Sequence, residues 1–287
     1  MSDISRLGVV GCGLMGSGIA EVAALRGLDV VVAESTPELA AAGRDRVTAS
    51  LDRGLRRGKL TETEREQALT RLSFTHDLGD LADRQFVIEA VAENREIKSE
   101  VFRRLDKAVA DPDAVLATNT SSIPVVDLAV TTGRPSRVVG LHFFNPVPVQ
   151  KLVEVVPALT TSADTVARTR GFATENLGKV AVQAPDRSGF VVNALLVPYL
   201  LAAIRMVESA TASAEDIDSG MELGCAHPMG PLRLLDLIGL DTAQAVAESL
   251  YEEHKEPLYA APPLLRRMVA AGRLGRKSGQ GFYVYDA

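Results

Sequence analysis

A glycine-rich turn between two apolar runs constrains the fold of this chain more than any other feature of the sequence. Residues 7–10 form an apolar run, GCGLMG follows at residues 11–16, and good helix formers continue to residue 26. A second apolar run at residues 28–33 ends in Glu34, about 20 residues after the glycines. Strand, glycine turn, helix, strand and acid in this order predict a βαβ unit that binds a dinucleotide. A purely structural glycine turn would not account for an acid at this spacing.

The residues of the turn each have a physical task in such a unit. A tight turn is possible at Gly11, Gly13 leaves room for a pyrophosphate, and Gly16 lets the helix pack close to the strand. The helix N-terminus offers free N–H groups and the positive end of its dipole to phosphates. We therefore expect Glu34 to bind the adenosine ribose hydroxyls and the turn to contact the cofactor through Gly11, Gly13, Leu14, Met15 and Gly16.

Glu34 also bears on the choice between NAD and NADP. A carboxylate here repels the 2′-phosphate of NADP, and Ser35 and Thr36 follow with no arginine to receive that phosphate. The sequence therefore favours NAD.

Polar side chains follow two further predicted strands at the point where each strand ends. The strand at residues 86–91 meets a helix at 95–109, and Glu89, Glu93 and Lys98 lie at this junction. The strand at residues 115–118 runs into the turn NTSS at 119–122. In an open parallel sheet this edge binds ligands. A capped turn without a ligand is the simpler alternative for NTSS, since Ser and Asn are common in turns.

A histidine and a glutamate stand in two apolar runs separated by prolines. The run at residues 138–144 carries His142, and the run at 151–156 carries Glu154. A charged group buried in such a run needs a partner, and a histidine oriented by a carboxylate is a good general base near neutral pH. The alternative is a core histidine bonded to backbone and a glutamate on an exposed strand face.

The composition of the chain changes near residue 187. Before it, strands and helices alternate; after it, the periodicity is helical at residues 190–209, 214–223, 232–238, 242–251 and 263–271. We predict an α/β Rossmann-type dinucleotide-binding domain at residues 1–186, followed by a smaller all-α domain at 187–287. The apolar residues at 195–204 are dense enough to suggest burial on nearly all sides, in a core or in a dimer interface.

The charge and cysteine content exclude several classes of protein. A net charge of −6 argues against nucleic-acid and membrane-surface binding, which need a basic face. Cys12 and Cys225 are too few for a disulfide framework and fit a cytoplasmic protein. No apolar run reaches the ~18 residues of a membrane span, and residues 1–6 are polar rather than signal-like. We assign no residue to a metal.

A local basic cluster ends the helix predicted at residues 37–57. It contains Arg53, Arg56, Arg57 and Lys59. Taken alone, the cluster is better explained by a solvated face that complements the helix dipole. The functional alternative is a site for a phosphate-rich ligand such as coenzyme A.

Taken together, the motifs resemble the short-chain L-3-hydroxyacyl-CoA dehydrogenases, and within that family the bacterial 3-hydroxybutyryl-CoA branch. The resemblance covers essentially the whole chain and rests on motifs that occur in order. These are GxGxMG, EAVxE at 89–93, NTSS, HFFNPVP at 142–148, the glutamate of LVEVV, SGFVVN at 188–193, HPMGP and KSGQGFY.

The resemblance implies an oxidoreductase that interconverts (S)-3-hydroxybutyryl-CoA and acetoacetyl-CoA. In it His142 is the general base and acid, Glu154 orients His142, and Ser121 and Asn193 hold the substrate oxygen. The same comparison implies further cofactor contacts at Glu93, Lys98, Ser121, Asn145 and Lys277, coenzyme A contacts at Ser50 and Arg57, and a homodimer formed by the helical domain.

Two positions depart from the family pattern. Arg57 stands where the family has a lysine, which keeps the charge but changes the contact geometry. Glu34 stands where the family usually has an aspartate, so a longer arm makes the same contact.

Other functions on the same fold remain open from the sequence. The same chemistry could act on a longer or carrier-protein-bound 3-hydroxyacyl thioester, or on a sugar acid, although the basic cluster favours a phosphate-bearing carrier. A non-catalytic NAD-binding regulator is the alternative from another class, because fold alone does not give function. Such a regulator would have little need for a base, an orienting acid and two substrate holders.

Overall fold

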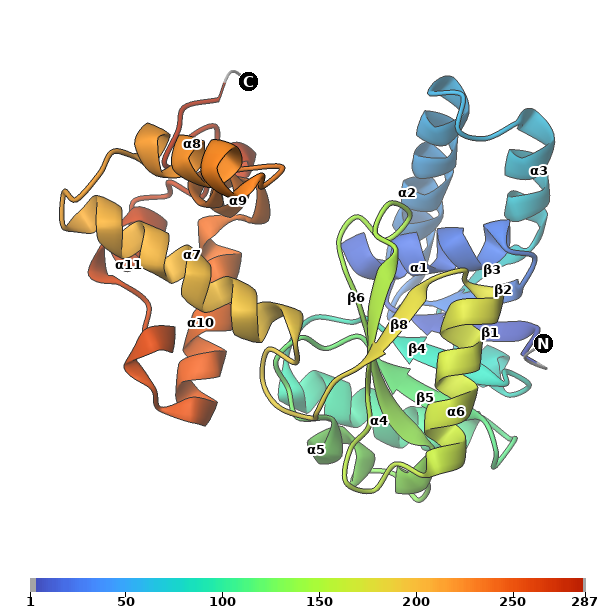
Figure 1. Ribbon diagram of the computed structural model, residues 1–287. Coiled ribbons are helices and arrows are strands. Elements are labelled where there is room, and N and C mark those ends of the chain that lie inside the picture. Colours follow the sequence, from blue (N-terminus) through green and yellow to red (C-terminus); the bar gives the residue numbers. More distant parts are fainter. Residues whose placement is uncertain (1–3, 286–287) are drawn as a thin grey trace. The chain divides into compact units, whose positions relative to one another are not determined.

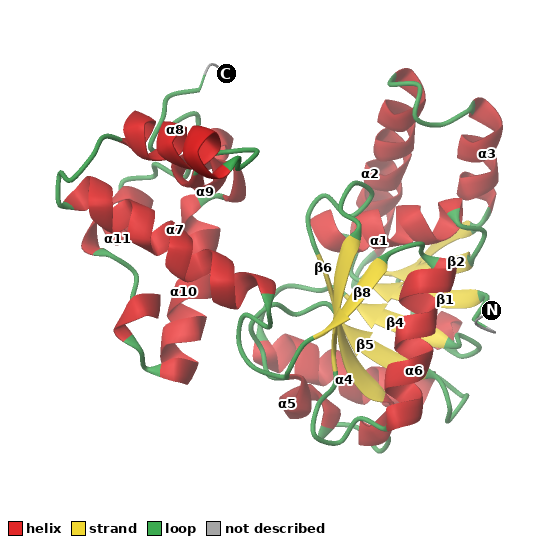
Figure 2. Cartoon of the chain, viewed as in Figure 1, coloured by secondary structure: helices red, strands yellow, loops and turns green. Residues whose placement is uncertain are grey.

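Two compact units make up the chain and divide it between Asp186 and Arg187. The computed structural model describes residues 4–285, so the expected domain limits at residues 1 and 287 lie outside the described residues. Unit 1 contains a sheet with helices, and unit 2 is helical (Figures 1 and 2). An α/β unit followed by a helical one confirms the predicted fold class.

The sheet of unit 1 has eight strands within the described residues, in the order β3-β2-β1-β4-β5-β6-β7-β8. Strands β1 to β6 pair in parallel, β7 runs antiparallel to β6, and β8 pairs in parallel with β7. Strands β1 to β6 therefore all end at one edge, where ligands bind in sheets of this type. The strands are β1 Arg6–Val10, β2 Asp29–Ala33, β3 Leu72–Thr75, β4 Phe86–Glu89, β5 Val115–Thr118, β6 Val138–Phe143, β7 Leu152–Val156 and β8 Val180–Gln183.

Helices cover both faces of this sheet (Figure 2). Phe86 and Ile88 of β4 join a core cluster with α1, α2 and the π-turn η3 (Phe172–Asn176), and the Phe86 and Phe172 rings stack at 4.3 Å. Val87 alternates with them and is also fully buried, which requires cover on the other face. The helices of unit 1 are α1 Leu14–Leu25, α2 Pro37–Arg56, α3 Glu62–Thr70, α4 Arg95–Ala108, α5 Val125–Ala129 and α6 Ala163–Gly171, with short turns η1 Leu78–Leu81 and η2 Pro135–Arg137.

The helices begin where the sequence offers caps. The Thr36 side chain accepts from the backbone N–H of Leu39, and Pro37 occupies the first position of α2. At α3, Thr61 and Glu64 form a reciprocal capping box. At α4, the Asn94 side chain caps the helix that follows β4. The caps of α2 and α4 lie where these helices leave the sheet edge, after β2 and β4.

Unit 2 is built around its own apolar core. Leu200, Leu201 and Ile204 of α7 pack with residues of the other helices, including Leu235 and Leu250. The helices are α7 Val192–Glu208, α8 Ala214–Cys225, α9 Pro231–Ile238, α10 Leu240–His254 and α11 Pro263–Ala270, with short turns η4 Pro257–Tyr259 and η5 Arg276–Ser278.

One side of α7 packs in the core of unit 2, and the expected burial of its other side in a dimer interface stays a prediction. Leu195 is 74% exposed, while Leu201 and Ile204 are fully buried. The reason is that α9, α10 and α11 contact α7 and cover the side that carries the buried residues.

Two buried aspartates hold the C-terminal segment of unit 2. Asp236 accepts from the backbone N–H groups of Phe282 and Tyr283, and Asp218 accepts from the Tyr283 hydroxyl at 2.8 Å. Asp218 also accepts from the N–H of Leu232 at the start of α9. The motif KSGQGFY therefore folds back onto α9.

No helix among residues 4–285 is long and apolar enough to cross a membrane.

Candidate active site

The glycine turn lies at the edge where β1 ends and α1 begins. Gly11 has a φ of +89°, and a Cβ there would lie 2.7 Å from the Ala90 carbonyl oxygen. A Cβ on Gly16 would lie 1.8 Å from the Gly11 carbonyl oxygen. Only glycine fits these two positions, because the turn and α1 approach each other without room for a side chain.

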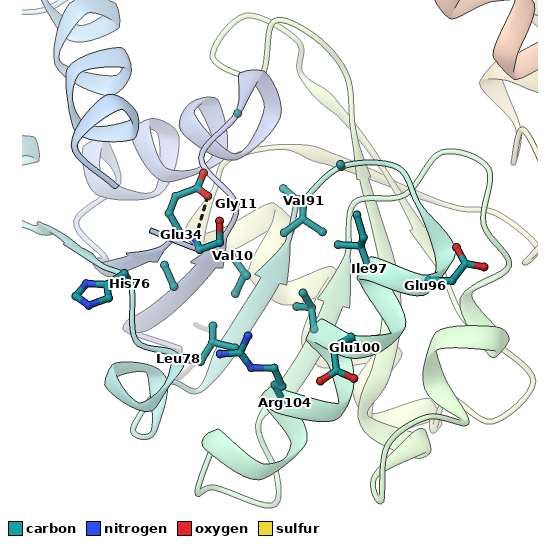
Figure 3. Close-up of a pocket in the computed structure, with 16 residues that line it drawn as sticks. Val10, Gly11, Glu34, His76, Leu78, Val91, Glu96, Ile97, Glu100 and Arg104 are labelled. Atoms are coloured by element: carbon teal, nitrogen blue, oxygen red, sulfur yellow. Dashed lines mark hydrogen bonds between the residues drawn. The ribbon is translucent and has the colours of Figure 1, made fainter. Parts of the chain in front are cut away.

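A cavity of about 720 Å³ opens beside the turn and is bordered by Gly11, Gly13 and Glu34 (Figure 3). Its walls are largely apolar, with Val10, Leu78 and Ile97 among them. A Cβ built on Gly13 would meet nothing within 4 Å, so the turn leaves open space for a ligand. The size, the apolar walls and the open turn fit a dinucleotide that rests its phosphates on the helix N-terminus.

Glu34 follows β2 and reaches back to the glycine turn. Its Oε1 accepts from the backbone N–H of Cys12 at 2.5 Å, and its Oε2 accepts from the N–H of Ser35 at 3.4 Å. Arg46 of α2 donates to the Cys12 carbonyl oxygen. The carboxylate is therefore held beside the glycine turn, in the lining of the cavity.

Strands β4 and β5 end in a network of carboxylates, hydroxyls and one lysine. Glu93 accepts at Oε1 from the Thr120 hydroxyl at 2.5 Å and from the Ser121 backbone N–H at 3.0 Å. Lys98 of α4 lies 3.3 Å from Glu93 Oε2 and is 1% exposed. Burial alone would raise the pKa of Glu93, but the Lys98 charge and the hydrogen bonds from Thr120, Ser121 and Ser122 hold it below its usual value.

His142 and Glu154 face each other across the antiparallel pair β6 and β7. They are direct register partners, and His142 Nδ1 lies 2.8 Å from Glu154 Oε2. Glu154 is fully buried and His142 is 7% exposed. The Phe144 ring packs against the imidazole with its centroid at 4.7 Å. The pair combines a histidine near the sheet edge with a buried acid that fixes the orientation of its ring.

A lysine that was not predicted from the sequence holds the loop between β6 and β7. Lys179 Nζ donates to the carbonyl oxygens of Val147 at 2.6 Å and Gln150 at 2.7 Å. Asn145 lies exposed in this loop. Asn119, the first residue of NTSS, accepts from the Phe143 backbone N–H at 2.9 Å and so ties the β5 turn to the end of β6.

The remaining predicted residues lie on helices. Ser50 of α2 is hydrogen-bonded to the carboxylate of Glu21. Burial raises the pKa of Glu21, and the Ser50 hydrogen bond and the Arg53 charge offset only part of that rise. Arg57 is exposed at the end of α2. In unit 2, Asn193 is half-buried in the first turn of α7, and exposed Lys277 pairs with Asp241 at 2.6 Å.

Unit 1 thus brings the predicted residues into three groups: the glycine turn with Glu34, the cluster of Glu93, Lys98 and Ser121, and the pair His142 and Glu154. Sequence reasoning noted Glu89 by position but gave it no role, and it gave no separate role to Thr118 or Thr120. Thr118 ends β5 and Thr120 lies within NTSS, and both are buried. The signal available in the sequence was the position of these hydroxyl-bearing residues at the end of a predicted strand. Glu93 accepts hydrogen bonds from the NTSS turn, and the role of this turn in a ligand site stays a prediction.

Comparison with known proteins agrees with this arrangement. Residues 6–187 match the family model of the 3-hydroxyacyl-CoA dehydrogenase NAD binding domain, and residues 189–285 match that of the C-terminal domain. A 3-hydroxybutyryl-CoA dehydrogenase of Mycobacterium tuberculosis is 60% identical over 286 residues, which cover 99% of this chain and 100% of the relative. The mitochondrial hydroxyacyl-coenzyme A dehydrogenase of Sus scrofa is 41% identical, with 98% and 91% covered.

A solved structure extends the likeness to the fold. The crystal structure of (S)-3-hydroxybutyryl-CoA dehydrogenase from Ralstonia eutropha matches with a TM-score of 0.94 at 44% identity, covering 99% of this chain and 100% of that one. The matches span both units and include the NAD-binding part. The chain therefore belongs to the 3-hydroxyacyl-CoA dehydrogenase family of NAD-dependent oxidoreductases.

Proposed function

We propose that this enzyme interconverts (S)-3-hydroxybutyryl-CoA and acetoacetyl-CoA through His142 and Glu154. The observation that carries the proposal is the 2.8 Å contact between His142 Nδ1 and the fully buried carboxylate of Glu154. The names of the relatives from Mycobacterium tuberculosis and Ralstonia eutropha support the substrate.

His142 acts as the general base in the oxidative direction. With Nδ1 bound to the carboxylate, Nε2 is the nitrogen that removes the proton from the 3-hydroxyl. Glu154 holds the ring in place and stabilises the imidazolium that forms. In the reductive direction the protonated imidazole donates to the developing alkoxide. The nicotinamide cofactor, when bound, supplies the hydride acceptor or donor.

The groups around the pair orient the reactants. By the family resemblance, Ser121 and Asn193 would hold the substrate oxygen. Glu93, Ser121, Asn145 and Lys277 would contact the nicotinamide end, and buried Lys98 would act there through Glu93. Glu34 and the glycine turn would hold the adenosine and the phosphates of NAD.

Coenzyme A would be held at α2. Arg57 is exposed at the end of this helix, and its guanidinium can bind a phosphate in a bidentate manner. Ser50 lies two turns earlier, hydrogen-bonded to Glu21. The same site would also accept a longer acyl-CoA or, without the nucleotide contacts, a carrier-protein thioester.

Steady-state kinetics of His142→Gln tests the catalytic proposal. We expect kcat for acetoacetyl-CoA reduction by NADH to fall by about 10²–10⁴-fold, the usual contribution of a general acid–base, while the Kd of NADH stays near wild type. His254→Gln is the matched control, because His254 packs against Tyr259 in unit 2. A His142→Gln enzyme with nearly normal kcat would refute the role of His142.

The substrate is tested in the same assay. Acetoacetyl-CoA, longer 3-ketoacyl-CoAs and the acetoacetyl-pantetheine thioester are compared, first with NADH and then with NADPH. A higher kcat/KM for the coenzyme A ester than for the pantetheine ester is expected from Arg57. Equal values would argue against a coenzyme A site on α2.

We also propose a cytoplasmic homodimer assembled through unit 2. The free thiols of Cys12 and Cys225 fit a reducing compartment. Large exposed apolar side chains on unit 2, including Leu195 and Leu223, support self-association through its helices.

A further inference from the structure

Glu89 is a fully buried carboxylate at the end of β4, in the middle of the sheet. Its Oε1 accepts from Lys98 Nζ at 2.6 Å and from the backbone N–H of Val91 at 2.7 Å. Its Oε2 accepts from the Thr118 hydroxyl of β5 at 2.8 Å. Both oxygens are therefore engaged by α4, by the β4 turn and by the neighbouring strand.

Lys98 connects this buried carboxylate to a second one near the surface. Its ammonium lies 2.6 Å from Glu89 and 3.3 Å from Glu93 Oε2, and the Glu93 side chain is 37% exposed. The buried Lys98 charge is thus neutralised mainly by Glu89. Glu89, Lys98 and Glu93 together carry one net negative charge, since the Lys98 charge balances only one of the two carboxylates. The remaining negative charge is that of Glu93, which can therefore bind other partners.

Glu93 uses that charge to organise the NTSS turn. One oxygen, Oε1, receives the hydroxyls of Thr120 and Ser122 and the backbone N–H of Ser121. Thr118 extends the same chain, since its hydroxyl oxygen accepts from the Thr120 N–H. The charge of Glu89 therefore acts on the turn through Lys98 and Glu93, while its contact with the neutral Thr118 hydroxyl is one that a glutamine at position 89 can also make.

We propose that Glu89 is a positioning residue, which fixes Lys98 so that Glu93 and the Ser121 turn are held in the geometry that receives the nicotinamide end of the cofactor. The inference rests on the proposed cofactor contacts of Glu93 and Ser121. Glu89 itself lies beneath them, is fully buried and needs no contact with NAD. Its effect passes through an ion pair whose members are fixed by the sheet and by α4.

Removal of the Glu89 charge alters the cluster in a definite way. A glutamine keeps the volume and the acceptor for Val91, but it leaves the buried Lys98 with Glu93 as its remaining counter-ion. Glu93 then turns toward Lys98 and gives up hydrogen bonds to residues 120–122. The turn loosens where the cofactor binds, although the fold around it stays the same.

NADH titration of a double-mutant cycle tests this proposal without any acyl substrate. We expect Glu89→Gln and Lys98→Met each to raise the Kd of NADH by about tenfold, the value of one charge-assisted hydrogen bond. Because Glu89 acts through Lys98, Glu89→Gln should add nothing in the Lys98→Met background. Asp106→Asn is the matched control: it weakens an ion pair of α4 with Arg134 at 2.8 Å, and should leave the Kd unchanged.

The cycle separates positioning from simple stabilisation. The proposal would be overturned if Glu89→Gln lowered the melting temperature but left the Kd of NADH unchanged. It would also be overturned if the increases in Kd caused by Glu89→Gln and Lys98→Met multiplied in the double variant. If a single variant fails to fold, the charge-balanced Glu89→Gln/Lys98→Met pair still decides the question. We expect this pair to fold and bind NADH about tenfold more weakly; binding as tight as wild type would overturn the proposal.

The outcome is also independent of the proposed catalytic function. Wild-type protein that binds NADH but fails to reduce acetoacetyl-CoA would refute that function, while the Kd values would still report on Glu89. Conversely, an active enzyme whose Kd is unaffected by Glu89→Gln would refute only the role of Glu89.

Discussion

At the scale of single residues, charge in an apolar run was the most informative signal in this sequence. Glu154 stands among valines and a leucine, and a buried carboxylate without a partner costs several kcal/mol, on the order of the penalty for breaking a buried ion pair. The structure supplies the partner, because β6 and β7 pair His142 with Glu154 in register. The pairing was predictable because each residue stands in an apolar run, where a buried charged group needs a partner.

The coupling of this pair is open to a kinetic test. Glu154→Gln keeps an acceptor for His142 Nδ1 but removes the charge, so we expect kcat to fall on the order of 10²-fold. In the His142→Gln background the same change should have little further effect, since residues that act as a unit are strongly non-additive. The measurement is kcat of the two single variants and the double variant with saturating NADH. Independent, multiplying effects would show that Glu154 does not act through His142.

Other contacts between residues could not be predicted from the sequence. Glu89, Glu93 and Lys98 lie close together in the chain, yet nothing in their spacing says that Lys98 is buried between the two acids. That contact depends on where α4 leaves the sheet, which the Asn94 cap determines. Glu34 likewise reaches the Cys12 N–H because the turn curls toward β2.

At the scale of elements, local periodicity predicted most strands and helices but not their neighbours. Apolar runs of four to six residues read as buried strands, while the order β3-β2-β1-β4-β5-β6-β7-β8 comes from long-range pairing. The predicted strand at residues 86–91 ends at Glu89, because the Glu89 carboxylate takes the Val91 N–H out of the ladder. Helix α5, with five residues, is too short to show a helical period.

The packing of α2 on the glycine turn gives a prediction at this scale. A Cβ on Gly43 would lie 2.7 Å from Cys12 Cβ, in the wall of the turn, whereas a Cβ on Gly54 would meet the end of the Leu60 side chain at 2.8 Å. We expect Gly43→Ala to destabilise the protein by about 1–3 kcal/mol through overpacking and to weaken NADH binding. Gly54→Ala is the matched control, since Leu60 can move and alanine favours the helix by up to about 1 kcal/mol.

Urea unfolding and NADH titration measure both effects. The free energy of unfolding should fall for Gly43→Ala and stay level or rise for Gly54→Ala, and the Kd of NADH should change for Gly43→Ala alone. Equal behaviour of the two variants would mean that α2 adjusts to the turn without cost.

At the scale of the whole molecule, each unit has its own core, and unit 2 also carries several large apolar side chains at its surface. Leu195, Leu223 and Leu237 are 74%, 87% and 50% exposed, although the helices that carry them have well-packed inner faces. The dense apolar stretch around Leu195 left a core helix and a dimer interface as alternatives. Within unit 2 the core uses one side of α7, and we propose that self-association covers exposed leucines such as Leu195.

The dimer is tested by molar mass in solution. We expect wild-type protein to sediment as a dimer and the variant Leu195→Glu/Leu223→Glu to shift toward monomer, because two buried carboxylates without partners cost several kcal/mol at an apolar interface. Leu159→Glu is the matched control: Leu159 is 97% exposed but belongs to unit 1. In analytical ultracentrifugation over a range of concentrations, this control should have the same molar mass as the wild-type protein. A monomeric wild-type protein, or a double variant that stays dimeric, would exclude an interface built on these two leucines.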